Sequence, residues 1–176
     1  GESPLRGESV RVEAIVTAVL SNGFFMQEED TDADGDAATS EGVFVFTRDA
    51  PTVAVGDLVR VDGVVDEFFG ETQLEDATVE TIATERTLPA AVALLIGAET
   101  TRDDYEAVEG MRVSATSATD DPLTITANFN FDRFGELQVS AGEKRQPTQQ
   151  FEPGGEEALA LIEANENNTL FIDDGS

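Results

Sequence analysis

An acidic stretch between two apolar segments carries residue types and a spacing that bind divalent cations. Counted from Asp30, carboxylates occupy the first, third, fifth, seventh and twelfth positions, and Gly35 occupies the sixth. This is the pattern of a twelve-residue calcium loop, in which alternate side chains turn inward and a glycine permits a sharp bend. The predicted ligands are Asp30, Asp32, Asp34, Asp36 through its backbone carbonyl, and Glu41 through both carboxylate oxygens. The sequence therefore predicts a structural Ca²⁺ site.

The segments that flank this loop are typical of strands. Residues 23–27 (GFFMQ) and 42–46 (GVFVF) are short and apolar, whereas the best-known setting of this motif is between two helices. We therefore expect a calcium-binding hairpin and not an EF-hand. The alternative is a plain solvated loop, because a chain with 37 acidic residues places acids in many loops.

Aromatic and basic residues offer a second chemistry, which is the binding of single-stranded nucleic acid. Bases stack on aromatic rings while cations contact the phosphates, and stacking contributes about 1–3 kcal/mol per base. The candidate stacking residues are Phe68, Phe69, Phe129, Phe131 and Phe134, and the candidate phosphate contacts are Arg60, Arg133 and Arg145. The alternative for each phenylalanine is packing in the core, and the alternative for Arg60 is a surface ion pair.

The composition argues against catalysis by this chain. It contains no His, which removes the commonest general base, and no Cys, which excludes disulfides and thiolate metal sites. Adjacent acids such as Asp103 and Asp104 point to opposite sides of an extended chain, so they do not converge on one atom. We expect a protein that is not an enzyme.

The charge balance limits the partners. Ten basic residues against 37 acidic ones give a net charge of -27, and Lys144 is the only lysine. Such a surface repels nucleic acid and anionic membranes at ordinary salt, but at about 1 M salt the Debye length falls to roughly 3 Å and screens this repulsion. Because the acids are spread along the whole chain, we expect a salt-adapted, halophilic protein. The alternative is an acidic domain that meets a cationic partner.

Period-two alternation of apolar residues predicts an all-β fold. Five strands are expected, at residues 10–20, 23–27, 42–46, 58–68 and from 72 to about 82. The short turns, and Gly63 as a bulge or bend in a long strand, favour a small Greek-key barrel of the OB-fold type. An immunoglobulin-like sandwich is the alternative.

The rest of the chain is expected to add strands and one helix to this barrel. Apolar residues 88–96 predict an extended segment or a short helix, and acidic residues 100–109 predict one or two helical turns. The further predictions are strands at 111–116, 123–127 and 136–140, a loop of aromatics and amides at 128–134, and a helix over 156–165. We expect one domain over residues 1–148, with residues 149–176 forming an extended connector, this helix and a terminal strand that pack on the barrel.

Neither a membrane span nor a leader is expected within the chain. No apolar run reaches the length of a membrane-spanning segment, so we expect no membrane partner. The first residues, GESPLRGES, lack an initiator Met and the apolar core of a signal peptide. We therefore expect a piece of a longer precursor, and we expect this piece to be monomeric.

The succession of motifs from about Val10 to Ser176 resembles one family. The matching strings are GFFMQEEDTDADGDAATSEGVFVF, VAVGDLVRVDGVVDEFFGETQL, LPA, YEAVEGMRV, LTITANFNFDRFGELQVS, RQPTQ and LFIDDGS. This order is similar to the region that precedes the catalytic domain in large secreted bacterial nucleases of the ExeM/NucH type. The resemblance implies an OB-fold accessory module of an extracellular DNase, whose separate endonuclease/exonuclease/phosphatase domain performs hydrolysis. The extreme acidity departs from OB-folds that grip DNA through a basic groove.

Two functions follow from these observations. In the first, the module binds single-stranded or locally opened DNA and positions it for the nuclease domain. In the second, it is a calcium-stiffened structural spacer that orients the nuclease domain without contacting DNA. The family context favours the first, and the scarcity of cations favours the second.

Overall fold

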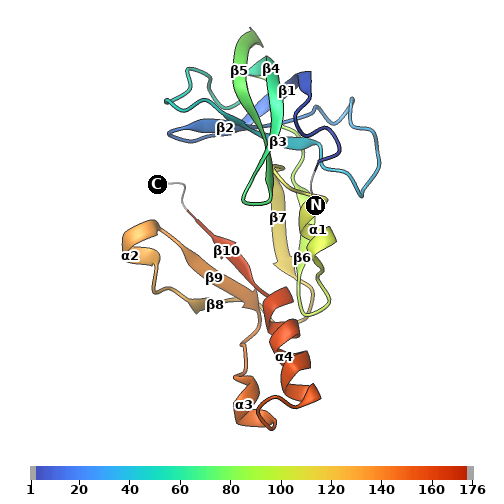
Figure 1. Cartoon of the computed structure of the whole chain (residues 1–176), viewed down its shortest axis with the longest axis vertical. Helices are drawn as coiled ribbons and strands as arrows, with labels where there is room; N and C mark the ends of the chain where they lie inside the picture. Colours follow the sequence, from blue (N-terminus) through green and yellow to red (C-terminus); the bar gives the residue numbers. More distant parts are fainter. Residues whose placement is uncertain (1–2, 174–176) are drawn as a thin grey trace. The chain divides into compact units, whose positions relative to one another are not determined.

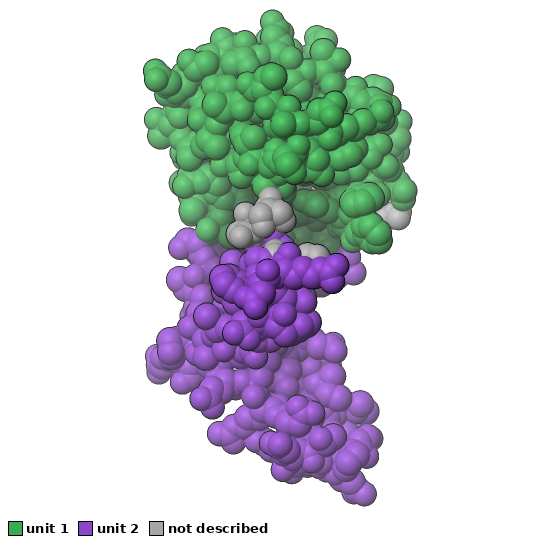
Figure 2. All heavy atoms as spheres, turned by 90° about the vertical axis from the view of Figure 1, so that its left-hand side faces the viewer, with its two compact units in different colours: residues 1–92, 103–113 green, residues 93–102, 114–176 purple. Residues whose placement is uncertain are grey.

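The computed structural model describes residues 3–173, with the exception of the side chain of Phe134. The chain is mostly strand with few helices (Figure 1), as the alternation of apolar residues predicts. It divides into two compact units, which Figure 2 distinguishes by colour. Unit 1 comprises residues 1–92 and 103–113, and unit 2 comprises residues 93–102 and 114–176. The predicted boundary near residue 148 lies inside unit 2.

Unit 1 is built on a five-stranded sheet that closes in a ring. The strands are β1 (Ser9–Val19), β2 (Gly23–Gln27), β3 (Gly42–Phe46), β4 (Leu58–Phe68) and β5 (Glu71–Ala83). Their order around the ring is β1-β2-β3-β5-β4, and β4 pairs with β1 to close it. All neighbours are antiparallel except β3 and β5, which run parallel. One closed sheet replaces the two packed sheets of the immunoglobulin-like alternative.

The core of this ring follows from the alternation of apolar residues. Along β4, every second residue from Val59 to Val65 is buried, and the residues between them are partly exposed. Val59, Val61 and Val65 join one apolar cluster whose other buried members are Ala14, Val16, Phe24, Met26, Val45 and Leu74. Burial of this apolar area is the main stabilising contribution to unit 1.

A bulge in β5, opposite Gly63 of β4, interrupts the regular pairing of these two strands. The pairing of β4 with β5 shifts its register between Asp62 and Val64, at Gly63. A Cβ atom on Gly63 would lie 3.2 Å from the Glu75 carbonyl oxygen and 3.2 Å from the Leu74 Cβ atom. The bulge or bend predicted at Gly63 is confirmed as a register shift, in which Asp76 and Ala77 of β5 lie opposite Gly63.

Unit 2 contains most of the remaining elements. A three-stranded sheet has the order β10-β9-β8, and a separate two-stranded sheet joins β6 to β7. The bounds are β6 (Val92–Ile96), α1 (Arg102–Glu106), β7 (Val113–Ser117), β8 (Leu123–Ala127), α2 (Phe131–Phe134), β9 (Leu137–Ala141), α3 (Pro147–Gln150), α4 (Glu156–Asn167) and β10 (Leu170–Ile172). Residues 103–106 of α1 belong to unit 1.

Most of the elements predicted beyond the ring are confirmed, and two are corrected. The helix expected over 156–165 is α4, and the expected terminal strand is β10. Residues 128–134 were expected to be a loop, but they include the short helix α2, which Gly135 ends at a φ of 67°. Residues 147–150 form a helical turn and not an extended connector, because Pro147 stands at the first helical position, which suits its fixed φ.

Candidate functional site

The acidic loop is the connection between β2 and β3. The Glu28 backbone N–H donates to the Glu41 carbonyl at 3.0 Å, directly beyond the last register pair of the two strands, Gln27 and Gly42. All twelve residues of the predicted calcium motif therefore lie in one closed loop at the end of this hairpin. The hairpin setting predicted from the flanking strands is confirmed.

The middle of the loop turns through side-chain hydrogen bonds to the backbone. Asp34 accepts from the Asp36 N–H at 2.6 Å and from the Thr39 hydroxyl at 3.2 Å, and Asp36 accepts from the Ala38 N–H at 3.0 Å. The bond from Asp36 holds the pKa of Asp34 below its usual value. Gly35 has a φ of 76°, a left-handed conformation that the sixth position of the motif requires.

The two ends of the motif are also anchored. Asp30 accepts from the Ala90 N–H at 3.0 Å, and Glu41 accepts from the Asp34 N–H at 3.1 Å. Asp32 is exposed at the loop surface. The carbonyl of Asp36, which was expected to face an ion, instead accepts from the Thr39 hydroxyl at 3.0 Å.

Glu28 is a member of this cluster that the motif count missed. It lies two residues before the first position of the motif, and the hairpin neck brings it beside Glu41. Burial, a hydrogen bond with Glu41 and the charges of Glu41, Asp32 and Asp34 raise the pKa of Glu28. The signal was the antiparallel pairing at the neck, which places the residue after β2 opposite the residue before β3.

The donor set suits calcium in type, although its side chains are not gathered as they would be around an ion. Glu28, Asp32, Asp34 and Glu41 supply hard carboxylate oxygens, which Ca²⁺ prefers, and the other three disfavour the ionisation of Glu28 and so raise its pKa. Over residues 3–173, however, no three acids converge closely enough to form a metal-binding group.

A second candidate site lies on the outward face of β2, β3 and β5. It is a hollow of about 290 Å³, called here the phenylalanine hollow. Its residues are Leu20, Asn22, Phe25, Phe44, Phe46, Phe68, Glu71, Gln73 and Glu75. The rings of Phe25 and Phe44 contact each other with centroids 4.9 Å apart, and no basic side chain lines the hollow.

Of the predicted stacking residues whose side chains the structure describes, Phe68 alone lines this hollow. Phe25, Phe44 and Phe46 were missed, although period two in GFFMQ and GVFVF carries the signal. Phe24 and Val45 point into the core, so their neighbours along each strand must point outward.

The turn between β4 and β5 carries two exposed rings, Phe68 and Phe69. Their centroids lie 4.7 Å apart in an edge-to-face arrangement, and Phe69 is 98% exposed. Phe69 has a φ of 54° and Gly70 a φ of 91°. This two-residue turn favours Asn-Gly, and a bulky residue with positive φ is strained. For these two residues the core-packing alternative is wrong.

The arginines of unit 1 are already engaged. Arg60 donates to Glu13 at 2.7 Å and to Glu80 at 3.0 Å, so the ion-pair alternative holds for this residue. The other pairs are Arg6 with Asp66, Arg11 with Asp62, Arg48 with Asp76 and Arg86 with Glu29, while Arg112 donates to the Pro89 carbonyl. Unit 1 therefore presents no unpaired arginine track to a phosphate backbone.

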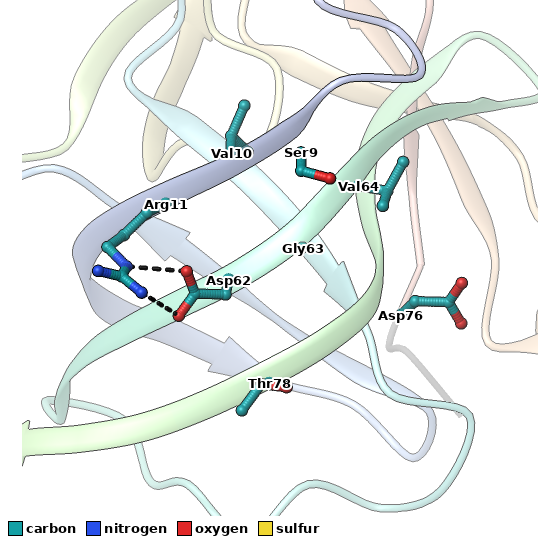
Figure 3. A pocket seen from close by; sticks show the side chains of 8 residues that line it. All are labelled: Ser9, Val10, Arg11, Asp62, Gly63, Val64, Asp76 and Thr78. Atoms are coloured by element: carbon teal, nitrogen blue, oxygen red, sulfur yellow. Dashed lines mark hydrogen bonds and ion pairs between the residues drawn. The ribbon is translucent and has the colours of Figure 1, made fainter.

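A groove on β1, β4 and β5 illustrates this pairing (Figure 3). It encloses about 400 Å³ around the bulge at Gly63, and Arg11 is the one basic residue that lines it. The Arg11 guanidinium donates to both Asp62 carboxylate oxygens, at 2.8 and 3.2 Å. This fork-to-fork geometry satisfies the arginine within the protein.

The remaining candidates belong to unit 2. Phe129 and Phe131 flank the start of α2 and are 77% and 52% exposed, so neither is a core residue. Arg133 and Arg145 are also exposed. The side chain of Phe134 lies outside the described part of the structure. The phenylalanine hollow, by contrast, is formed by residues of unit 1.

Comparison with known proteins finds no relative. No protein-family model matches the chain, and neither the curated proteins nor the solved structures contain a significant match. Among the described residues, no helix has the length and apolar character needed to cross a bilayer.

The carboxylate cluster predicts a pH-dependent effect of one substitution. Because the pKa of Glu28 is raised in the folded state, its ionisation costs stability as pH rises above the usual glutamate range, near pH 4.3. We expect Glu28→Gln to raise the melting temperature at neutral pH in calcium-free buffer, and to leave it unchanged near pH 4. Thermal unfolding at both pH values, with Glu8→Gln as a matched charge control, measures this effect. An equal shift at both pH values would contradict the assignment.

Proposed function

We propose that this chain is a non-catalytic, OB-fold-like accessory module that binds single-stranded or locally opened DNA beside the nuclease domain of a secreted DNase. The observation that carries the proposal is Phe69, a fully exposed ring held in a strained conformation next to an aromatic hollow. A ring that is 98% exposed adds little to the core, and strain of this kind concentrates at sites of contact with ligands.

The topology supports an OB-fold-like Greek-key barrel. Five strands close in the order β1-β2-β3-β5-β4, and the long strand β4 pairs with both β1 and β5. OB-folds bind oligonucleotides on the face of strands 2 and 3, together with the loop that joins strands 4 and 5. The phenylalanine hollow lies on β2, β3 and β5, and Phe68 and Phe69 stand at the turn between β4 and β5.

The charge distribution supports stacking as the source of affinity. Six arginines of unit 1 are engaged within the protein, so few counterions would be released from a phosphate backbone. Bases can still stack on phenylalanine rings, because stacking depends little on charge. The net charge of -27 suits this mode to a salt-rich setting, where repulsion from DNA is screened.

The parent protein and its location are proposed from the motif resemblance described above. The chain contains no His, which agrees with a division of labour in which hydrolysis belongs to another domain. In this proposal the module holds a strand that the nuclease domain then cuts.

We also propose that the acidic loop binds Ca²⁺ as a structural ion. The ligands would be drawn from Asp30, Asp32, Asp34, Asp36 and Glu41, with Glu28 added by the hairpin neck. When bound, the ion would offset the repulsion among these carboxylates. The backbone bonds of Asp34 and Asp36 already set the curvature that such a loop needs.

The second candidate function is a spacer that orients the nuclease domain without contacting DNA. The paired arginines of unit 1 favour it, since they leave that unit without a free cationic track. The two functions differ in whether the exposed rings contact DNA, and the following measurements separate them.

Phe69→Asn is expected to raise stability while it lowers DNA affinity. Asn tolerates the left-handed conformation, so relief of strain should stabilise unit 1 by roughly 1 kcal/mol. Loss of the ring should weaken binding of a labelled single strand about fivefold or more. Urea unfolding and fluorescence anisotropy measure the two effects, with Phe171→Asn as the control for an exposed ring elsewhere. Unchanged affinity in Phe69→Asn, or no binding by the parent chain, favours the spacer.

Binding is expected to tolerate salt or to strengthen with it. A protein that neutralises many phosphates loses affinity steeply as salt rises, whereas this acidic chain gains from screening. Anisotropy titrations between low and molar salt should therefore give a slope of log K against log salt that is flat or positive. A steep negative slope would point to a cationic track and contradict stacking as the main contribution.

Calcium is expected to raise the melting temperature, and a chelator is expected to lower it. An ion that binds only the folded loop stabilises the protein in proportion to its occupancy. Asp32→Asn and Glu41→Gln should reduce the calcium response, and Asp120→Asn, an exposed acid of unit 2, should leave it intact. Differential scanning calorimetry with calcium, magnesium or chelator measures the response. A melting temperature that does not change with calcium would contradict the proposed Ca²⁺ site.

A further inference from the structure

The phenylalanine hollow combines aromatic walls with hydrogen-bond acceptors. Phe25, Phe46 and Phe68 line it with apolar rings, while Glu71 and Glu75 line it with carboxylates. Its lining contains neither lysine nor arginine. A ligand that fits must therefore present a flat or apolar face to the rings and hydrogen-bond donors to the acids.

Glu71 is the acid placed to meet such a ligand. It opens β5 and is the register partner of Phe68 across the β4–β5 turn. Its side chain is half-buried, and within residues 3–173 no donor is recorded at its carboxylate. The Glu109 carboxylate, which accepts from the Thr72 N–H at 2.6 Å, has the same sign and disfavours the charge of Glu71. A half-buried carboxylate without a donor gains from any ligand that supplies one.

Two amides, Asn22 and Gln73, also line the hollow. Gln73 is 5% exposed and donates through its Nε2 atom to the Glu75 Oε1 atom at 2.7 Å. One donor of the buried amide is thus engaged by a neighbouring acid.

Among the bases of single-stranded DNA, those with an amino group match this lining. Cytosine presents its N4 amino group to a carboxylate, whereas thymine and uracil present the O4 carbonyl at the same position. An O4 carbonyl facing Glu71 would place two acceptors together with no proton between them.

We infer that the phenylalanine hollow stacks a base carrying an exocyclic amino group and reads that group through Glu71, so that the module prefers cytosine-containing strands to uracil- or thymine-containing strands. This inference rests on the proposed DNA-binding function and specifies its base preference. Glu71 is the specificity-determining residue, and the rings supply the base-independent part of the affinity.

The test compares two strands that differ at position 4 of the base. Labelled oligo(dC) and oligo(dU) of equal length are titrated into the whole chain at molar salt and mildly alkaline pH. Deoxyuridine replaces thymidine so that no methyl group differs. We expect oligo(dC) to bind at least about fivefold more tightly, in line with the discrimination of one specific base contact.

Two variants assign the preference to the carboxylate. Glu71→Gln can turn either its oxygen or its nitrogen toward the base, so the ratio of the two affinities should fall to about one. Glu8→Gln removes the same charge outside the hollow and should leave the ratio unchanged. Melting temperatures of both variants check that the fold is retained, and chemical-shift changes at Phe25 and Phe46 locate the base.

Each alternative outcome contradicts either the base preference or the DNA-binding function. Equal binding of both strands by the parent chain overturns the base preference but leaves the DNA-binding proposal standing. Tighter binding of both strands by Glu71→Gln, with no change in their ratio, shows that Glu71 only repels phosphate and overturns the preference too. Absence of binding by either strand at any salt concentration overturns the DNA-binding function itself. Capture of a short arginine peptide in the hollow, in place of both strands, assigns the site to a basic protein partner and overturns the inference.

Discussion

Closure of the five-stranded sheet is the constraint on which the rest of unit 1 depends. The strand β1 pairs with β4 from Ser9 to Ile15 and with β2 from Ile15 to Val19, so one strand serves two neighbours. Likewise β5 pairs with β4 along its length and meets β3 through Gln73 and Leu74. Because the ring encloses one apolar cluster, a residue next to a core residue on β2 or β3 must face outward. The phenylalanine hollow is a consequence of this closure.

The acid excess shapes the surface more than it shapes the core. Exposed ion pairs such as Arg48 with Asp76 contribute about 0–1 kcal/mol each, so the apolar cluster and not the pairs holds unit 1 together. The pairs nevertheless have a functional consequence, because they occupy the cations that a phosphate backbone would otherwise meet. What remains on the outward face of β2, β3 and β5 is aromatic and acidic. Such a surface is suited to contacts that survive high salt, since stacking is not screened as charge contacts are.

Strand positions could be predicted from the sequence because each ring strand carries its own alternation. The bounds of β2, β3 and β4 agree with the predicted segments, and α4 was predicted from its apolar spacing and acidic first turn. The prediction was less accurate where tertiary contacts decide. Alternation over residues 10–20 predicts that Ile15 faces away from the core residues Ala14 and Val16, yet Ile15 is 1% exposed, because β1 is covered on both sides at this point. Local pattern cannot report such a second covering layer.

The candidate sites could likewise be predicted only where tertiary contacts do not decide which residues come together. The calcium pattern identified the loop residues, because ligand spacing is a property of one continuous segment. Glu28 and the three phenylalanines of β2 and β3 lay outside any such motif, and only strand pairing brings them to their sites. Phe68 and Phe69 were predicted as stacking residues. The strained conformation of Phe69, however, follows from the two-residue hairpin and not from the identity of the ring.

The two candidate sites share one structural element, the β2–β3 hairpin. Gln27 and Gly42 end the paired strands at the acidic loop, and Phe25 and Phe44 face each other two residues further along the same hairpin. An ion that orders the loop would reduce fraying at the neck, where Glu28 and Glu41 repel each other when both are ionised. A less mobile neck holds Phe25 and Phe44 in their contact, and a preformed aromatic wall costs less ordering when a ligand stacks on it. Ion binding and ligand binding would then stabilise the same conformation, and by linkage each would strengthen the other.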